Sequence, residues 1–462
     1  MKILFVENRY ATWVYAAVAR ELILRGHEIH WLVQNPMFAP DFGTVHVIPF
    51  PKKKQITTTD TSYDWLARTD RGLLHFGATK EHYPAYDRAI GQIIGDVRPD
   101  VTFGESTEFH ELLTINHCKR MEVPYLVPYV MRYPTDRMAF VAFDTMDPVG
   151  GDGTQLTTEE VDAMISGIRQ RQVVPSYMRP TAPAPITHRI HRLVDKARIT
   201  LGWLRGERYI TPSPLRKLAL NAARNTAHQQ WEAQAQANWL RWENLLSEGT
   251  PWVLYAMQMQ PESNLDVWGA PWNDQTLLIR EAAMALQSVG AILVVKPNPK
   301  SKYEMTSELT ELIASLPNVI ALPHNTPMAN VFPHAPLVLS VTGTVLMECV
   351  FAGKPVASLG SHAMAKYPGV IHLEQPNSIA QALKESLSCR APCATQTQAR
   401  DLLQSLQATS YSASIWDPVA QPEFATDKAI ASLSGAFIHV IDSMLSLDKK
   451  GHDWKLDNQL YR

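Results

Sequence analysis

The sequence predicts an α/β protein built from two doubly wound domains, each a parallel sheet covered by helices. Strand-like apolar runs alternate with helical segments at the amino terminus, and the same alternation returns from residue 252 onward. The 462 residues, 45% of them hydrophobic, are enough for two separate cores. We expect an amino-terminal domain over residues 1–245 with a helical insertion, a carboxyl-terminal domain over 250–425, and a last helix with a polar tail over 426–462.

The first domain opens with a strand, a loop, an apolar-periodic helix that ends at Gly26, and a second strand. Residues 34–86 show little regular pattern, and we expect loops there. A helix at about 86–97 and a strand at 101–104 follow. This order is the usual beginning of a doubly wound sheet.

The middle of the chain, residues 135–250, breaks the alternation of strands and helices. A helix capped by Thr157 or Thr158, with Glu160 nearby, precedes a proline-rich run. Ala- and Gln-rich helical sequence then covers about 214–246. The pattern does not predict how these helices pack.

The second domain begins with a strand at 252–258 and keeps a strict strand–helix order. The expected helices are at 274–289, at 306–316, between 322 and 337, and after Thr344, and the expected strands are at 291–295, 319–322, 337–341 and 356–359. A last amphipathic helix is expected at 425–447.

Composition and charge exclude several classes of protein. A formal net charge of −2 gives no basic field for nucleic acid, and no run of about 18 apolar residues is present to span a bilayer. The first ten residues lack the apolar core of a signal peptide, so we expect a cytoplasmic protein. The four scattered cysteines predict reduced thiols and no metal site.

The strongest functional motif lies in residues 337–360, where a strand, a turn, a helix and a second strand follow one another. Thr342, Gly343 and Thr344 stand where the helix opens, and helix starts attract phosphate. Glu348 follows one helical turn after Thr344 on the same face, where its carboxylate would accept hydrogen bonds from ribose hydroxyls. This order predicts a nucleotide-sugar site; the alternative is an ordinary βαβ unit with a solvated Glu348.

Other polar residues follow neighbouring strands of the same sheet, at the edge where open α/β sheets bind ligands. Lys296 and Asn298 come directly after a buried strand. His324 follows the next strand, either facing the ligand or satisfied within its loop. Gln260 and Glu262 lie in the loop after the first strand, where they would touch the donor sugar or the interdomain hinge, or serve the structure alone.

Candidate catalytic residues follow the strand at 101–104 in the first domain. Glu105 is the first carboxylate after that strand and is our candidate general base, with Glu108 and His110 as competitors. The alternative for Glu105 is that it simply caps the next helix. The first loop holds Glu7 with two candidate acceptor contacts, Asn8 and Arg9, of which Arg9 fits a surface position equally well.

The three carboxyl-terminal motifs resemble those of bacterial GT-B glycosyltransferases. Gln260-Pro261-Glu262, Lys296-Pro297-Asn298-Pro299 and Thr342-Gly343-Thr344 occur in the same order as the Gln-Pro-Glu loop, the Lys-x-His-Pro element and the hydroxyl-bearing turn of capsule Kdo transferases and, more distantly, of bacterial sialyltransferases. Asn298 stands where that family has histidine. The resemblance covers about residues 250–375 and implies a GT-B fold, with two Rossmann-like domains facing a cleft.

The resemblance implies an inverting transferase without metal or cofactor that moves a sugar, such as Kdo or another ulosonic acid from its CMP donor, onto a surface polysaccharide or a lipid-linked glycan. The alternatives are a UDP-sugar transferase, a non-hydrolysing UDP-sugar 2-epimerase, and a non-catalytic nucleotide-sugar-binding subunit of a polysaccharide assembly complex. The carboxyl-terminal tail either makes a peripheral membrane contact or is simply solvated. The residues for that contact are Lys449, Lys450, Trp454 and Lys455.

Overall fold

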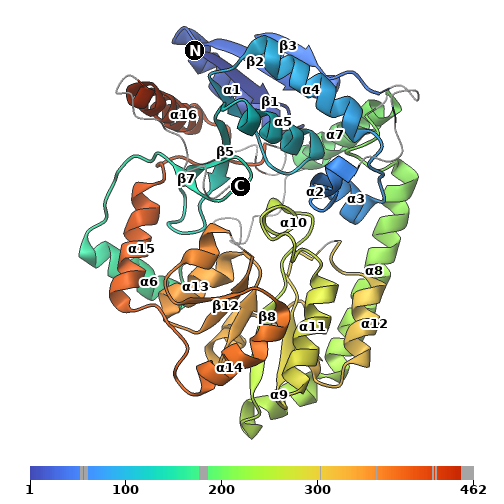
Figure 1. The fold of residues 1–462 in the computed structure, drawn as a ribbon, viewed down its shortest axis with the longest axis vertical. Helices are drawn as coiled ribbons and strands as arrows, with labels where there is room; N and C mark the ends of the chain where they lie inside the picture. Colours follow the sequence, from blue (N-terminus) through green and yellow to red (C-terminus); the bar gives the residue numbers. More distant parts are fainter. Residues whose placement is uncertain are drawn as a thin grey trace.

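The structure, a computed structural model, describes residues 1–51, 56, 61–175, 186–205, 207–301, 303–360, 362–418, 421 and 424–448. These residues form two α/β units, each with its own sheet, at the top and bottom of Figure 1. The predicted fold class, α/β with two Rossmann-like domains, is therefore confirmed. Within the described residues, no helix is both long and apolar enough to cross a membrane.

The first sheet has the strand order β3-β2-β1-β4-β5-β6-β7. Its strands are β1 (Lys2–Val6), β2 (Glu28–Val33), β3 (Thr44–Val47), β4 (Val101–Phe103), β5 (Tyr125–Val130), β6 (Met138–Ala142) and β7 (Pro148–Val149). The first five are parallel, and β6 and β7 extend the sheet antiparallel. In the central strand, Phe5 pairs in register with Trp31 and Phe103, so three stacked aromatic rings fill one face.

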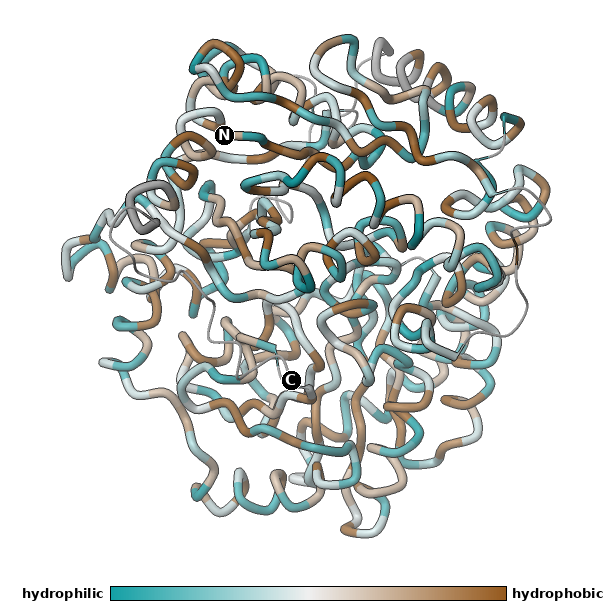
Figure 2. The backbone as a smooth tube through the Cα atoms, turned by 45° about the horizontal axis from the view of Figure 1, so that its top comes forward, coloured by the Kyte–Doolittle hydropathy of each residue, from teal (hydrophilic) through white to brown (hydrophobic). Residues whose placement is uncertain are grey.

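Helices cover both faces of this sheet (Figure 1). Those around it are α1 (Ala11–Leu24), α2 (Asp64–Ala67), α3 (Arg71–Phe76), α4 (Tyr83–Val97), α5 (Phe109–Arg120) and α16 (Asp427–Asp448). The last helix, α16, returns to the first sheet and packs beside α1. Its Phe437 contacts the rings of Phe5, Phe103 and Phe140. In Figure 2 the strands beneath the amino terminus are coloured mainly as hydrophobic, as a doubly covered sheet requires.

The second sheet is wholly parallel, with the strand order β10-β9-β8-β11-β12-β13. Its strands are β8 (Trp252–Ala256), β9 (Ile292–Lys296), β10 (Val319–Ala321), β11 (Val338–Ser340), β12 (Val356–Leu359) and β13 (Val370–Leu373). Its helices are α10 (Ser263–Asp266), α11 (Gln275–Gln287), α12 (Ser307–Ser315), α13 (Thr344–Ala352), α14 (Ile379–Leu387) and α15 (Gln396–Ala408), with short 3₁₀ turns η7 (Ala363–Lys366) and η8 (Pro376–Ser378).

The middle helices attach to both units. They are α6 (Thr158–Arg169), α7 (Ile186–Leu204), α8 (Pro214–Ala237) and α9 (Trp239–Glu248). The first of them packs on α13 and α15, and α8 runs down one side of the molecule to α12 (Figure 1). Thr157 caps α6 through the predicted capping box with Glu160. The domain limits expected from the sequence stay a prediction, and the proline-rich run at 180–185 lies outside the described residues.

Two expectations about local structure are wrong. Residues 34–86 hold β3, the 3₁₀ turns η1 (Pro36–Phe38) and η3 (Thr61–Tyr63), α2, α3 and the start of α4, instead of loops alone. Elements of three to six residues are too short to show a period. The helix expected between 322 and 337 is replaced by two 3₁₀ turns, η5 (Met328–Asn330) and η6 (Phe332–His334). Pro327, Pro333 and Pro336 interrupt this segment, and proline breaks a continuous helix.

Candidate functional site

The predicted phosphate-binding turn forms the start of α13. Gly343 occupies the N-cap position with a φ of 101°, a conformation that favours glycine. Thr342 fixes the turn, because its amide donates to Gln258 Oε1 at 3.0 Å and its hydroxyl donates to the Asn264 carbonyl at 2.8 Å. The buried Thr342 hydroxyl therefore serves the turn itself, whereas Gly343 and Thr344 are partly exposed.

Glu348 is buried one turn further along α13, and its carboxylate has partners from the first half of the chain. Arg171, just after α6, donates from Nη1 to Glu348 Oε2 at 2.8 Å. The Tyr133 hydroxyl, in the loop after β5, donates to Glu348 Oε1 at 3.3 Å. The alternative of a solvated Glu348 is therefore wrong, because the carboxylate lies in a contact between the two units.

Lys296 ends β9 with its ammonium buried. Its Nζ donates to the Pro297 carbonyl at 2.9 Å. Burial lowers the pKa of Lys296 to about 8, and the nearby charge of Arg171 acts in the same direction. Asn298, by contrast, turns its Oδ1 back to accept the Lys300 amide at 2.8 Å, which is a local turn contact.

His324 lies after β10 and is held by α8. Its Nδ1 is 2.6 Å from Glu232 Oε1, and its ring stacks on His228 with centroids 4.0 Å apart. Burial lowers the pKa of His324. The three side chains offer ligand atoms within 4.8 Å of one another, a grouping that could hold a metal ion. The sequence analysis did not single out His228 or Glu232, although their spacing of four puts them on one helix face.

Gln260 and Glu262 lie where the two units touch. Gln260 Nε2 donates to Asp266 Oδ1 at 2.7 Å, and the Glu262 amide donates to Asp266 Oδ2 at 3.1 Å. The same Asp266 Oδ1 lies 3.0 Å from His75 Nε2 of α3 in the first unit. These contacts support the interdomain reading of this loop.

Glu105 follows β4 directly. Its Oε1 accepts the Tyr15 hydroxyl at 2.8 Å, and its carbonyl accepts the Tyr125 hydroxyl at 2.7 Å. Burial raises the pKa of Glu105 to about 7, and the charge of Glu111 adds to the rise. Glu108, rather than Glu105, occupies the N-cap of α5, so the capping alternative for Glu105 is wrong. A carboxyl group that titrates near neutral pH suits general base catalysis.

The two competitors for the role of base are buried, whereas Glu105 is partly exposed. Glu108 Oε1 lies 3.3 Å from Arg71 Nη1, and its Oε2 has no hydrogen-bond partner among the described residues. His110 Nε2 lies 2.8 Å from the Glu7 carbonyl, so that nitrogen carries the proton. Within the described part of the chain, His110 Nδ1 has no partner.

The first loop brings Asn8 and Arg9 to the same place. Asn8 Nδ2 donates to Glu111 Oε1 at 2.8 Å, which ties the loop to α5. Burial works to lower the pKa of Arg9, but the charges of Glu108, Glu207 and Glu7 outweigh it and raise that pKa. Arg9 is therefore surrounded by carboxylates, and the alternative that it is a surface residue is wrong.

Two further carboxylates belong to this cluster, of which the sequence analysis missed Glu207. Glu7 is buried and accepts the backbone amides of Arg9 at 2.6 Å and Asn35 at 2.8 Å. Glu207 comes from the link between α7 and α8, and burial raises its pKa to about 7. No spacing or motif connects Glu207 to the first loop, because it lies about two hundred residues further along the chain.

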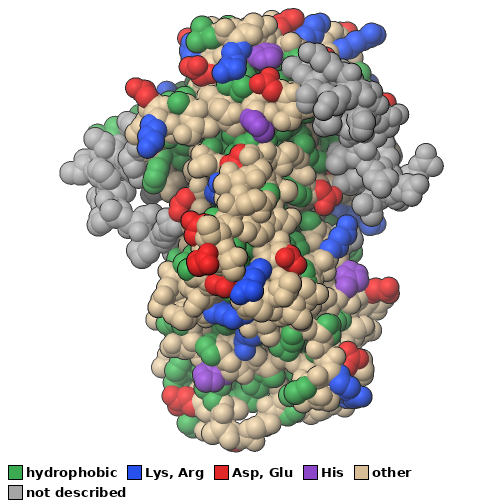
Figure 3. All heavy atoms as spheres, turned by 90° about the vertical axis from the view of Figure 1, so that its left-hand side faces the viewer, with side chains coloured by type: hydrophobic (Ala, Val, Ile, Leu, Met, Phe, Trp, Pro, Cys, Tyr) green, Lys and Arg blue, Asp and Glu red, His purple; other side chains and the backbone are tan. Residues whose placement is uncertain are grey.

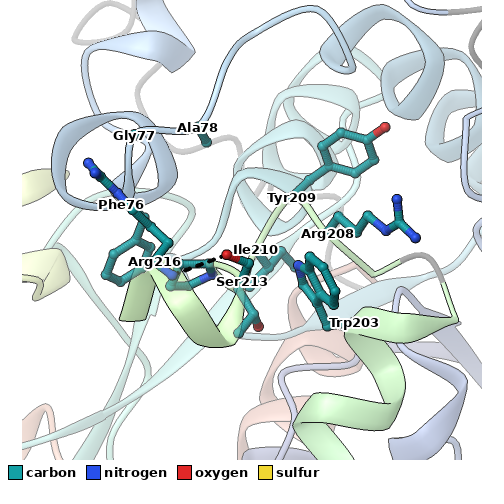
Figure 4. Close-up of a pocket in the computed structure, with 11 residues that line it drawn as sticks. Phe76, Gly77, Ala78, Trp203, Arg208, Tyr209, Ile210, Ser213 and Arg216 are labelled. Carbon is teal, nitrogen blue, oxygen red and sulfur yellow. Dashed lines mark hydrogen bonds between the residues drawn. The ribbon is translucent and has the colours of Figure 1, made fainter. Parts of the chain in front are cut away.

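A cavity of about 250 Å³ adjoins this cluster. In Figure 4, Trp203, Arg208 and Tyr209 line one side of it, and Phe76 and Arg216 line the other. The Arg208 guanidinium lies 5.1 Å from the centre of a Trp203 ring. Thr211 also lines the cavity, and its hydroxyl accepts a hydrogen bond from Arg9. Aromatic rings next to cations suit a polar, anionic ligand.

The predicted residues thus form two groups, one at the carboxyl end of each sheet. Glu105, Glu108, His110, Asn8 and Arg9 lie on the first unit, and Lys296, Thr342, Gly343, Thr344 and Glu348 on the second. Tyr129 at the end of β5 contacts Trp268, which follows β8, and Tyr133 after β5 contacts Glu348, which follows β11, so the two carboxyl edges face each other. This is the GT-B arrangement that the sequence predicted.

No protein-family model matches the chain, and no curated protein matches it either. Solved structures similar to it include UDP-GlcNAc 2-epimerase from Neisseria meningitidis bound to UDP-GlcNAc, at 11% identity over 88% of this chain and 99% of that chain with a TM-score of 0.29. An α,α-trehalose-phosphate synthase (UDP-forming) from Burkholderia vietnamiensis is 13% identical over 88% and 96%, with a TM-score of 0.31. The calicheamicin glycosyltransferase CalG4 is 15% identical over 88% and 93%, with a TM-score of 0.26. The fold assignment rests on the two sheets themselves rather than on these likenesses.

Proposed function

We propose that this protein is a glycosyltransferase that binds a nucleotide sugar between its two sheets. The observation that carries the proposal is the placement of Glu105, whose pKa is raised to about 7, at a sheet edge facing the edge that bears Lys296 and the start of α13. A base on one side and phosphate-binding groups on the other are what transfer from a nucleotide requires.

In the proposed reaction, an acceptor hydroxyl attacks the anomeric carbon of the donor sugar while the bond from that carbon to the phosphate oxygen breaks. Glu105 takes the proton of the attacking hydroxyl, and the nucleotide leaves with the bonding electrons. The amides at the start of α13 and the Lys296 ammonium stabilise the negative charge on the departing phosphate. Following the resemblance, we propose inversion at the anomeric carbon and no metal.

For the donor we propose a CMP-linked ulosonic acid such as Kdo, with a UDP sugar as the competing choice. A second activity, 2-epimerisation of a UDP sugar, has one observation in its favour. Glu105 and Glu207 both have pKa values raised to about 7, and an epimerase needs more than one acid or base around a single sugar. Isomerised product in the absence of any acceptor would decide for the epimerase.

For the acceptor we propose a lipid-linked glycan, reached at a cytoplasmic membrane surface. The tail to which the sequence analysis assigned the membrane contact, with Lys449, Lys450, Trp454 and Lys455, lies outside the described residues. Helix α7 supports the contact instead. It carries an exposed apolar stripe at one-face spacing, formed by Ile190, Leu193, Val194, Leu201 and Leu204, each 45–64% exposed.

Cations accompany this stripe. Lys196 is exposed on α7, and Arg205 is exposed directly after the last residue of that helix. Burial lowers the pKa of Lys217 in α8, and the charge of Lys196 acts in the same direction. An apolar helix face with basic neighbours suits an anionic lipid surface. The end of α7 also contributes Trp203 to the cavity beside Arg9, which would bring a lipid-linked acceptor close to the proposed base.

The proposal is tested by calorimetric binding of CMP, UDP and GDP to the wild type and to Thr344→Val and Glu348→Ala. Binding of CMP alone, weakened by both substitutions, supports the ulosonic-acid donor. Preference for UDP or GDP would still support the nucleotide-binding site but would contradict a CMP-linked ulosonic acid as the donor. Absence of all binding contradicts the transferase. Biological activity that survives Glu105→Gln, Glu108→Gln and His110→Ala while donor binding persists points to a non-catalytic subunit.

A further inference from the structure

Arg132, in the loop after β5, is a buried cation that has no counter-charge in the described part of the chain. The residue is only 6% exposed, and its Nε has no hydrogen-bond partner among the residues that the structure describes. Among the described residues, no carboxylate forms an ion pair with it. The contact that the structure gives its guanidinium is with the Tyr129 ring, 5.1 Å from Cζ to the ring centre. A buried charge without a partner is costly and rare in a folded protein.

Arg137, five residues further along the same hairpin, shows what a paired arginine looks like here. It is 8% exposed, nearly as buried as Arg132. Its Nη2 donates to Asp152 Oδ2 at 2.6 Å, and its Nε donates to Ser410 Oγ at 2.7 Å. The two arginines of this hairpin are similarly buried but differ in their partners, because Arg137 has a carboxylate and neutral acceptors, whereas Arg132 has no carboxylate among the described residues.

The surroundings of Arg132 place it over the carboxyl edge of the second sheet. Tyr129 packs against Trp268 in the loop after α10, with ring centroids 5.7 Å apart. Tyr133 bonds to Glu348 of α13. Burial raises the pKa of Tyr367, after β12, to about 12, and the charge of Arg132 acts against that rise. Arg132 thus lies among residues that follow β8, β11 and β12, the strands around the start of α13.

We propose that Arg132 binds an oxyanion of the donor, a phosphate or a sugar carboxylate. The proposal rests on the function proposed above and adds a donor ligand from the first domain to those of the second. A guanidinium offers two parallel N–H donors that match such a group. Arg171 is already neutralised by Glu348, whereas neither Arg132 nor Lys296 forms an ion pair among the described residues, so both can meet a negative ligand there. A donor held by both would link the two domains.

The test compares Arg132→Met with Arg137→Met as the matched control. Melting temperature without ligand and calorimetric affinity for CMP and UDP are measured for each. For Arg132→Met we expect an unchanged or higher melting temperature and a loss of nucleotide affinity of at least about tenfold, the size of a hydrogen bond to a charged group. For Arg137→Met we expect a lower melting temperature and an affinity within about twofold of the wild type.

Arg132→Lys keeps the positive charge but loses the two parallel N–H donors of the guanidinium, and it replaces Arg132→Met in the test if the methionine variant does not fold. We expect Arg132→Lys to bind the nucleotide more weakly at an unchanged melting temperature. Free Kdo is the probe for the carboxylate source. Loss of nucleotide affinity assigns Arg132 to phosphate, and loss of Kdo binding alone assigns it to carboxylate. Unchanged affinity for both probes overturns the inference and leaves the transferase proposal standing. A wild type that binds neither overturns both.

Discussion

The Arg171 guanidinium and the Glu348 carboxylate form an ion pair of 2.8 Å between the segment after α6 and helix α13. Both side chains are largely buried, and the Tyr133 hydroxyl donates to the same carboxylate. The Glu348 carboxylate, which the sequence predicts to bind a ribose, is thus already bonded to an arginine from the other half of the chain. A nucleotide that uses Glu348 must share or displace that arginine.

Removing Arg171 should destabilise the protein. In Arg171→Ala, Glu348 stays buried with the Tyr133 hydroxyl as its one remaining side-chain partner among the described residues, and breaking a buried ion pair in this way costs about 3–5 kcal/mol. The free energy of unfolding from urea titration measures this cost. The double variant Arg171→Met with Glu348→Leu should recover most of the loss, because it leaves no charge buried. Equal stability of the wild type and Arg171→Ala would mean that the pair is solvated in solution.

Glu105→Gln should slow transfer without changing donor affinity. The amide cannot accept the proton of the acceptor hydroxyl, and loss of a general base costs about 10²–10⁴ in rate. The fold should persist, since the amide oxygen still accepts the Tyr15 hydroxyl. In the wild type, kcat should rise with pH through about 7, where the Glu105 carboxyl ionises. Glu21→Gln, on an exposed face of α1, is the control and should transfer at the wild-type rate.

The same substitution should change how stability depends on pH. The pKa of Glu105 is raised on folding from 4.5 to about 7, so the folded state holds the proton more tightly than the unfolded chain. The stabilisation is complete below about pH 4.5 and is lost as the pH rises through 7. Glu105→Gln does not ionise, and its stability relative to the wild type should increase by roughly 2–4 kcal/mol between pH 4 and pH 8. Chemical denaturation at several pH values measures the difference; a flat difference would place the pKa near its ordinary value.

The sequence predicted those parts of the site that lie within one strand–turn–helix unit. The hydroxyl-bearing turn, Lys296 and Glu105 were found because each follows a strand directly, and position after a strand is a local signal. The partners of Glu348 could not be found that way. Tyr133 and Arg171 lie 215 and 177 residues from it, and they meet it only because two separately folded units dock.

Burial of charge was the other property hidden from the sequence. Arg132 and Arg137 are both arginines in the segment after β5, and nothing in the local pattern shows that one finds Asp152 and the other finds no carboxylate among the described residues. In the same way, burial raises the pKa of Glu207, the charge of Arg9 from the first loop opposes that rise, and the charge of Glu7 adds to it. Such properties depend on which surfaces the two sheets bring together.

The apolar stripe on α7 should bind anionic vesicles. The wild type should sediment with vesicles that contain phosphatidylglycerol and remain in solution with phosphatidylcholine alone, because cations accompany the stripe. Leu193→Glu with Leu201→Glu removes exposed apolar area that would enter the lipid and adds two negative charges, so vesicle affinity should fall by more than about tenfold. Leu240→Glu changes a leucine that is 66% exposed on α9, at the opposite end of the molecule in Figure 1, and should leave sedimentation unchanged. On the described part of the face in Figure 3, acidic and basic side chains are interspersed, so general charge attraction there should not hold the protein to vesicles. Sedimentation that persists in the α7 double variant would assign the membrane contact to another surface.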